Sequence, residues 1–384
     1  MVIKNKGGYI MKDILFKEGQ SIKDRLVEIS EFMYHNPELG NKEFKSAEQL
    51  ITLLEEHNFK VEKEFLGLKT AFRAVYDSNK PGLTVGYLCE YDALPEIGHG
   101  CGHNMIGTMS AGAGVILSKI LDKVGGRIIV YGTPAEETDG AKVIFAEQGV
   151  FEELDAAMIL HPSDKSSKSG TSMALYPLQF TYKGKTAHAA SCPQDGINAL
   201  NSVIQLFNGI DALRQHVTPD VRMHGIITQG GVAANIVPDE AVAQFYFRAA
   251  KKETVMELLE KVKKIAEGAA LMTGATLEME RYELPYDDLV THENLSEAFT
   301  ENMKALGITE FEEDKTFGSS DIGNVSHIVP TIHPTIGISN CSVISHSREM
   351  ADATISDLGH ERLLIGTLAL AYTGYDVLTK QVEL

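Results

Sequence analysis

Side chains able to bind metals or move protons follow three apolar runs of this sequence, at the point where each run ends. The runs are residues 84–89, 128–131 and 156–160. The residues that follow them are Glu90, Asp92, His99, Cys101 and His103, then Glu136 and Glu137, and then His161. If the runs are parallel strands, their carboxyl ends meet at one edge of a sheet, where such sheets bind ligands. Carboxylates, imidazoles and a thiol at one edge predict a transition-metal site for zinc, manganese or cobalt.

Each of these residues also has an ordinary explanation when it is taken alone. The pair Glu136-Glu137 is typical of a solvated helix start, and Cys101 of a buried thiol beside a glycine turn. Asp92 is equally typical of a turn before a proline. Adjacent acids can instead divide the chemistry, one binding a metal while the other takes a proton from water. The prediction therefore depends on the convergence of these groups.

Two kinds of element must position these residues. Helical patterns over 20–57, 105–121 and 141–151 alternate with the apolar runs, which predicts an α/β domain with a mostly parallel sheet and helices on both faces. Residues 173–284 instead follow the order β-α-β-β-α-β of a ferredoxin-like α+β domain. We predict a discontinuous metal-binding catalytic domain of residues 1–172 and 285–384, and an inserted lid or dimerisation domain of residues 173–284.

Composition limits the partners. The 384 residues are 43% hydrophobic and 23% charged, and carry a formal charge of -18, which disfavours binding to nucleic acid or to anionic lipid. We expect no membrane-spanning segment, because such a segment needs about 20 consecutive apolar residues. Four cysteines without a CxxC pair suit a reducing cytoplasm.

The string EYDALPEIGHGCGHN at 90–104 resembles the metal-binding signature of the aminoacylase and carboxypeptidase-G superfamily of dinuclear metallohydrolases. It is most similar to the amidohydrolase branch, which contains hydrolases of aminobenzoyl-glutamate and of N-acyl amino acids. The resemblance covers nearly the whole chain. Its other motifs are HNPE at 35–38 with Glu43, TPAEE at 133–137, HP at 161–162, GKTAHAA at 184–190, ANIVPD at 234–239, GSSDIG at 318–323, and His346.

This resemblance implies two divalent metal ions per subunit, zinc or manganese, with cobalt as a further option. Cys101 would bridge the two ions as a thiolate, a state that adjacent cations enforce. His103, Glu137, His161 and His346 would complete the two coordination spheres.

The resemblance also implies catalytic roles. Glu136 would be the general base that activates a metal-bound water and later protonates the leaving nitrogen. Asp92 would stabilise the site without binding the metal directly. His188, which in relatives reaches in from the partner subunit, would stabilise the oxyanion. Asn235 and Arg248 are candidates for binding the carboxylate or carbonyl end of the substrate, although Arg248 can equally be a solvated strand end.

Some positions depart from the commonest pattern of the branch. Asn104 stands where many members have Asp, Ser320 where many have Glu, and Glu90-Tyr91-Asp92 replaces a frequent Asp-Met-Asp. These variants resemble the aminobenzoyl-glutamate-hydrolase subgroup. We expect Asn104 and Ser320 to lie near the site and to change its charge, and with it the substrate class.

The sequence thus predicts a metal-dependent amidohydrolase or peptidase acting on N-acyl amino acids, aminobenzoyl-glutamate-like conjugates or short peptides. Two alternatives stay open: a thiol hydrolase with Cys101 as nucleophile, and a binding protein that kept the fold without its chemistry. The family resemblance implies a homodimer formed through the lid domain, and leaves higher homo-oligomers open.

Overall fold

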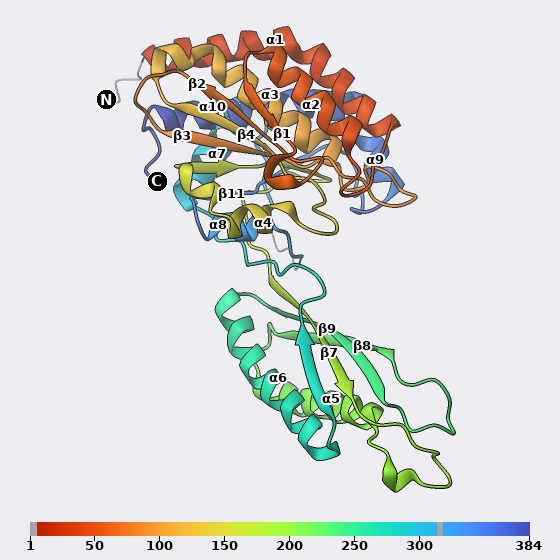
Figure 1. Ribbon diagram of the computed structural model, residues 1–384. Helices are drawn as coiled ribbons and strands as arrows, with labels where there is room; N and C mark the ends of the chain where they lie inside the picture. Colours follow the sequence, from red (N-terminus) through yellow and green to blue (C-terminus); the bar gives the residue numbers. More distant parts are fainter. Residues whose placement is uncertain (1–5, 313–317) are drawn as a thin grey trace. The chain divides into compact units, whose positions relative to one another are not determined.

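The computed structural model describes residues 6–312 and 318–384 (Figure 1). The chain divides into two compact units. The first comprises Met1–Thr171, Leu289–Thr316 and Asn324–Leu384, and the second comprises Ser172–Asp288 and Phe317–Gly323. Residues 318–323, which we predicted as part of the first domain, group with the second unit. The reason is local bonding, since Met173 N donates to Gly318 O at 2.8 Å.

A six-stranded sheet forms the centre of the first unit (Figure 1). Its strands, in spatial order, are β1 (Lys60–Lys63), β2 (Phe72–Asp77), β4 (Arg127–Gly132), β3 (Thr84–Cys89), β5 (Ala156–Met158) and β11 (Thr331–Ile332). The pairs β3–β4, β3–β5 and β5–β11 are parallel, whereas β1–β2 and β2–β4 are antiparallel. The three strands predicted to deliver the site residues are therefore neighbours with their carboxyl ends at one edge.

Helices surround this sheet. They are α1 (Lys6–His35), α2 (Phe44–Glu56), α3 (His103–Val124), α4 (Ala141–Glu147), α7 (Glu293–Ala305), α9 (Arg348–Thr354) and α10 (Asp357–Leu378). The short helix α8 (Ile322–Ser326) begins in the segment that groups with the second unit and ends in the first. Short 3-10 turns occur at Phe65–Gly67 and Val150–Glu153. A separate parallel pair is formed by β6 (His161–Ser163) and β12 (Thr335–Gly337).

The helices cover both faces of the sheet. Gly114 of α3 lies against Val130 of β4, whereas Phe145 of α4 packs on the neighbouring Tyr131, with ring centroids 6.1 Å apart. Successive side chains of a strand point to opposite faces, so α3 and α4 lie on opposite sides of the sheet. α1 and α10 pack against α3 to form the thicker layer (Figure 1). The predicted α/β class with a mostly parallel sheet is confirmed.

Helix α3 is the core helix of this unit. By length and composition it could cross a membrane, contrary to our expectation for this sequence, but 94% of its apolar window is buried within the fold. Its glycines and alanines allow this burial, because they let neighbouring helices and strands approach closely. Gly112, for example, faces Leu26 of α1 and Thr367 of α10.

Several predicted elements end earlier than expected. The helical pattern over 20–57 is two helices, because Pro37 and the positive φ of Asn41 (62°) interrupt it between His35 and Phe44. The pattern over 141–151 is helical only to Glu147. The strand expected over 156–160 stops at Met158, and His161 begins β6 instead of ending that strand.

The second unit is an antiparallel sheet of four strands with two helices (Figure 1). Its elements are β7 (Ala174–Lys183), α5 (Ala199–Leu213), β8 (Arg222–Gln229), β9 (Glu240–Ala249), α6 (Lys252–Thr273) and β10 (Thr276–Glu280), with 3-10 turns at Pro193–Asp195 and Arg214–His216. The spatial order is β10-β7-β9-β8. Phe180, Phe245 and Phe247 form the aromatic centre of its separate core. The β-α-β-β-α-β order is as predicted.

Candidate metal centre

The loop after β3 carries the first group of site residues. Glu90 and Asp92 are each only 1% exposed, and the following turn closes on Gly102, whose φ of 79° suits a residue without a Cβ. Gly102 also packs on Pro162, so the loop lies against the start of β6. His103 is the first residue of α3 and is buried as well. The fold thus buries two carboxylates and an imidazole at the end of β3.

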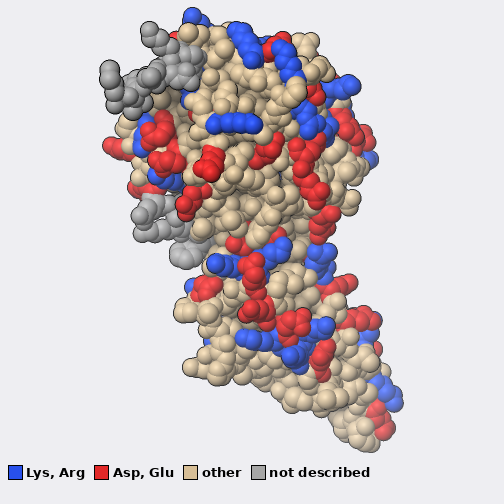
Figure 2. All heavy atoms as spheres, turned by 90° about the vertical axis from the view of Figure 1, so that its left-hand side faces the viewer, with Lys and Arg blue, Asp and Glu red and all other residues tan. Residues whose placement is uncertain are grey.

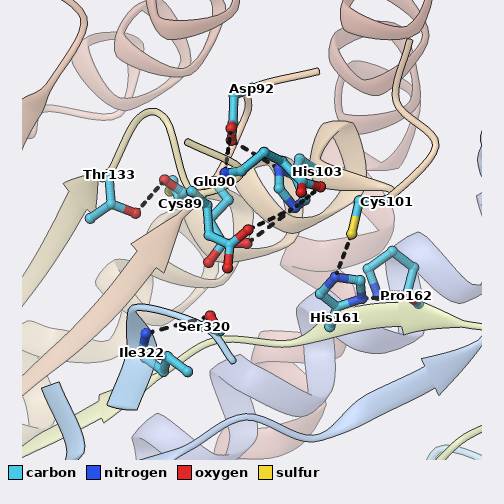
Figure 3. A network of polar contacts seen from close by, with 12 residues as sticks. Cys89, Glu90, Asp92, Cys101, His103, Thr133, His161, Pro162, Ser320 and Ile322 are labelled. Atoms are coloured by element: carbon cyan, nitrogen blue, oxygen red, sulfur yellow. Dashed lines mark hydrogen bonds and ion pairs between the residues drawn. The ribbon is translucent and has the colours of Figure 1, made fainter. Parts of the chain in front are cut away.

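Asp92 orients His103 and the next acidic loop together (Figure 3). Its Oδ1 lies 2.9 Å from His103 Nδ1, and its Oδ2 accepts the backbone N–H of Glu137 at 3.0 Å. When the Nδ1–H of His103 donates a hydrogen bond to Asp92, the other ring nitrogen, Nε2, faces three carboxylates. Their oxygens lie 3.5–4.0 Å from Nε2 and belong to Glu90, Glu136 and Glu137. Burial opposes a charge on His103, but Asp92 and Cys101 raise its pKa well above the ordinary value. The surroundings of Nε2 therefore favour positive charge.

Cys101 and His161 face each other (Figure 3). Cys101 Sγ lies 3.4 Å from His161 Nε2, and His161 Nδ1 lies 2.6 Å from the carbonyl oxygen of Pro162. A proton on Nδ1 donated to that carbonyl leaves the Nε2 lone pair directed at the sulfur side. Burial, with His333 and His103, lowers the pKa of His161 to about 3, so the ring is neutral and able to bind a metal.

The loop after β4 brings in Glu136 and Glu137. The loop is tied to the end of β3, because Thr133 N and Oγ1 both donate to Cys89 O at 2.8 and 2.9 Å. Glu137 Oε1 lies 3.4 Å from Nε2 of His346, a residue with φ of 64° whose backbone N–H donates to Gly100 O. The C-terminal part of the chain is thereby held against the cysteine loop.

These side chains form three groups in which every ligand atom lies within 4.8 Å of the others. The groups are Cys101, His103 and His161; Cys101, Glu137 and His346; and Glu90, His103 and Glu136. The first two share Cys101, as a bridging thiolate requires. His103 Nε2 and Glu137 Oε1 are buried without a hydrogen bond in the described part of the chain, as expected of atoms that bind cations. The donor set of thiolate, imidazole and carboxylate fits divalent transition metals.

The structure adds residues that we did not predict as members of the site. Lys142 of α4 is fully buried, and its Nζ lies 2.7 Å from Glu90 Oε1. His333 lies beside His161, with ring centroids 5.7 Å apart. Burial opposes ionisation of Glu90, but Lys142, His103 and His333 outweigh it and lower the pKa of Glu90 to about 2. A lysine within an apolar helical run is the sequence signal that points to such a buried pair.

Two residues of the signature at 90–104 lie outside these groups. His99 is buried, and burial lowers its pKa to about 3, but it belongs to none of the three groups. Asn104 is fully buried, and its Nδ2 donates to Ser30 and to Thr354 Oγ1. Asn104 therefore ties α3 to α1 and α9, and the expectation that it changes the charge of the site stays a prediction.

His188 and Asn235 meet within the second unit. His188 and Ile236 form a β-bridge, and Ala189 N donates to Asn235 O at 3.0 Å. The Nδ1 of His188 accepts the backbone N–H groups of Ala190 and Ser191, each at 3.2 Å. Because Nδ1 accepts these hydrogen bonds, the ring proton of neutral His188 is on Nε2, and Nε2–H is available as a donor.

Arg248 has unused hydrogen-bonding capacity. Its Nη1 donates to Ser319 Oγ at 3.3 Å, and its guanidinium lies 5.7 Å from the centre of the Tyr246 ring. Its Nε is buried and makes no hydrogen bond with the residues that the structure describes. Such a guanidinium is suited to a carboxylate ligand.

The comparisons with known proteins agree with this geometry. Residues 177–272 match the peptidase dimerisation domain of the M20 family. The Xaa-Arg dipeptidase of Mus musculus is 35% identical over 374 residues, covering 93% of this chain and 86% of that protein. One of the subunits of the p-aminobenzoyl-glutamate hydrolase of Escherichia coli is 32% identical over 314 residues, covering 76% of this chain and 65% of that protein.

Solved structures show the same fold at lower identity. The aminobenzoyl-glutamate utilization protein of Klebsiella pneumoniae has a TM-score of 0.73 at 17% identity, over 94% of this chain and 98% of that one. The YXEP protein of Bacillus subtilis, described as a dinuclear metal-binding peptidase of the M20 family, has a TM-score of 0.70 at 21% identity, over 94% and 99%. Together with the identity to the dipeptidase along most of both chains, these matches show that the chain belongs to the M20 peptidase family, in its amidohydrolase branch.

Proposed function

We propose that this M20 hydrolase is a dipeptidase whose general base is Glu136. The observation that carries the proposal is the pair of ligand groups sharing Cys101, beside a second acid that neither group needs. One group would use Cys101, His103 and His161, and the other Cys101, Glu137 and His346. Zinc or manganese is the proposed ion, with two ions per subunit. Divalent ions bound there would polarise the substrate carbonyl and lower the pKa of water toward about 7.

Proton transfer is assigned to Glu136. It directly precedes Glu137, and its Oε2 lies 4.0 Å from His103 Nε2, so its carboxylate lies at the edge of the ligand cluster. From there it would take a proton from the attacking water and return it to the leaving nitrogen. His188 of the partner subunit would donate its Nε2–H to the oxyanion, because its Nδ1 accepts two backbone N–H groups.

For the substrate, we propose dipeptides with a basic C-terminal residue ahead of aminobenzoyl-glutamate. The mouse relative named an Xaa-Arg dipeptidase matches at 35% identity over 93% of this chain. The 53 acidic residues exceed the 35 basic ones, and this excess attracts cationic substrates and repels anionic conjugates. Acidic and basic side chains are interspersed on the face in Figure 2, so the attraction is a long-range one. Arg248 and Asn235 would hold the terminal carboxylate.

The two alternative functions, a thiol hydrolase and a binding protein, fit the site less well. A thiol hydrolase needs a thiolate, but burial raises the pKa of Cys101 to about 12, which disfavours a thiolate in the absence of a bound cation. A binding protein could use the two groups that share Cys101, but it would have no use for a proton-transferring acid such as Glu136 beside them. Both alternatives therefore leave part of the arrangement unexplained.

We further propose a homodimer formed through the second unit. Strand β8 is at the edge of its sheet, and Ile226 on it is 63% exposed. Exposed apolar edge strands are usually covered by a partner.

The proposed location is the cytoplasm. All four cysteines are free, which supports a cytoplasmic location.

The proposed function is tested by metal analysis of the purified protein together with a substrate screen. Dipeptides ending in Arg or Lys, N-acyl amino acids and aminobenzoyl-glutamate are compared before and after chelation and after zinc or manganese is restored. We expect hydrolysis that is lost on chelation and restored by the ion, with Glu136→Gln inactive but loaded with metal. Activity that survives chelation would favour the thiol hydrolase, and metal-loaded protein that cleaves nothing would favour the binding protein.

A further inference from the structure

The segment between α1 and α2 lies against both acidic loops of the metal centre. Glu38 O accepts the backbone N–H of Ala93 at 2.8 Å, next to Asp92. Gly40 packs so closely on Ala135 and Thr138 that a Cβ at this glycine would lie 2.6 Å from Thr138 Oγ1. None of the residues 36–43 belongs to the ligand groups. The segment therefore contacts the loops that hold the site without supplying a metal ligand.

Glu43, the last residue of this segment, is fully buried. Its Oε1 accepts the backbone N–H of Ala135 at 2.8 Å, and its Oε2 accepts Thr70 Oγ1 at 2.9 Å. Thr70 is itself held, because Tyr91 Oη donates to its carbonyl oxygen at 2.7 Å. Both oxygens of this carboxylate are therefore used on neighbouring parts of the same unit.

Ala135 needs such an anchor. Its φ of 61° is a left-handed conformation that is unfavourable for a residue with a Cβ, and its side chain is buried. The residue that follows it is Glu136, and the next backbone N–H, that of Glu137, is bonded to Asp92 Oδ2. Two buried carboxylates thus hold the turn, one on each side of Glu136.

We infer that Glu43 is a positioning residue for Glu136, acting through its hydrogen bond to the backbone of Ala135. The inference rests on the proposed role of Glu136 as general base. Glu43 belongs to none of the ligand groups, and its hydrogen bond to Ala135 N lies one residue before Glu136, so its effect is on the direction of the general base. Positional errors of about 1 Å in a reacting group cost up to about 100-fold in rate.

Glu38 provides a matched control in the same segment. Its carboxylate accepts Ser46 N at 2.9 Å, Lys45 N at 3.2 Å and Ser46 Oγ at 3.0 Å, so it holds the first turn of α2. Removing its carboxylate takes away three hydrogen bonds, against two for Glu43, and these bonds lie away from the catalytic turn. Comparing the two variants therefore distinguishes a general loss of structure from a change in the direction of Glu136.

The test compares Glu43→Ala, Glu43→Gln and Thr70→Val with Glu38→Ala by hydrogen–deuterium exchange and by kinetics of the metal-loaded enzymes. We expect Glu43→Ala to speed exchange in peptides covering 133–140 and to leave 44–48 unchanged, while Glu38→Ala does the reverse. We expect kcat of Glu43→Ala to fall about 10- to 100-fold, with KM and metal content unchanged. The amide oxygen of Glu43→Gln can still accept from Ala135 N, so this variant should keep most of its rate.

Several outcomes would overturn the assignment. The assignment is wrong if Glu43→Ala exchanges over 133–140 at the wild-type rate, or if its kcat equals that of the wild type. It is also wrong if the loss of kcat follows a loss of metal, or if Glu38→Ala loses as much kcat. If Glu43→Ala does not fold, Thr70→Val decides, because loss of its hydroxyl should raise exchange over 133–140 and lower kcat in the same direction. If the wild-type enzyme cleaves no amide, the proposed function fails, while the exchange experiment still tests the anchor.

Discussion

Lys142→Met is the perturbation whose consequence follows most directly from the structure. The side chains of Lys142 and Glu90 are 0% and 2% exposed, with Nζ and Oε1 2.7 Å apart. Methionine fills a similar volume but leaves the Glu90 carboxylate buried without its ammonium partner. Breaking a buried ion pair on one side costs about 3–5 kcal/mol, a large part of a total stability of about 5–15 kcal/mol. We expect the midpoint of thermal unfolding to fall by roughly 6–20 °C.

The assay is urea and thermal unfolding of the metal-free protein, with Lys168→Met as the matched control. Lys168 pairs with Glu297 at 2.9 Å, but the two side chains are 49% and 57% exposed, so its loss should cost less than about 1 kcal/mol. The double variant Glu90→Gln with Lys142→Met removes both charges and should recover more than about 1 kcal/mol of the loss. If Lys142→Met were no less stable than Lys168→Met, the reasoning from burial would be refuted.

Three further predictions concern pH, metal affinity and assembly. Burial raises the pKa of Glu43 from 4.5 to about 7, so the folded chain keeps a proton that the unfolded chain loses, and the contribution of Glu43 to stability should fall by about 3 kcal/mol as pH rises from about 4.5 to 7. The pH profile of unfolding of chelated Glu43→Gln should lack this part of the fall, and a profile identical to that of the wild type would contradict the stated cause. Asp92→Asn alters the partner of His103 Nδ1 at 2.9 Å and should weaken metal binding about 10- to 100-fold in competition with a chromophoric chelator, whereas unchanged affinity would remove Asp92 from the orienting role. Ile226→Lys on β8, 63% exposed, should shift the protein toward monomer in analytical ultracentrifugation, while Ile204→Lys on α5 should not, and dimers that persist in both would exclude this edge.

Local patterns were sufficient for the elements that carry the ligands. The run 84–89 is β3 from its first to its last residue, because an uninterrupted apolar segment bounded by turns has few other solutions. The helix predicted over 105–121 lies within α3. The convergence of Cys101, His103 and His161 follows from parallel strands ending at one edge. Chain order therefore predicts that Cys101, His103 and His161 meet.

Contacts that depend on three-dimensional register were not predictable in this way. Glu43 meets Ala135 across 92 residues of sequence, and nothing in the predicted helical pattern over 20–57, which contains Glu43, indicates this contact. The break at Pro37 that ends α1 is what allows residues 36–43 to reach the acidic loops. The left-handed conformation of Ala135 has no signal in its residue type, since such turns usually carry glycine or asparagine.

Three acids of this centre, Asp92, Glu43 and Glu137, differ in how their oxygens are used. Asp92 bonds His103 with one oxygen and the Glu137 backbone with the other, and Glu43 likewise uses both of its oxygens on the protein. A carboxylate occupied in this way would have to give up a buried hydrogen bond to bind an ion, which is costly. Glu137 Oε1, in contrast, is buried without a hydrogen bond in the described part of the chain. The hydrogen-bond pattern thus separates the acids that aim the site from the acid that is free to bind a cation, although all of them are carboxylates within the same two loops and the segment beside them.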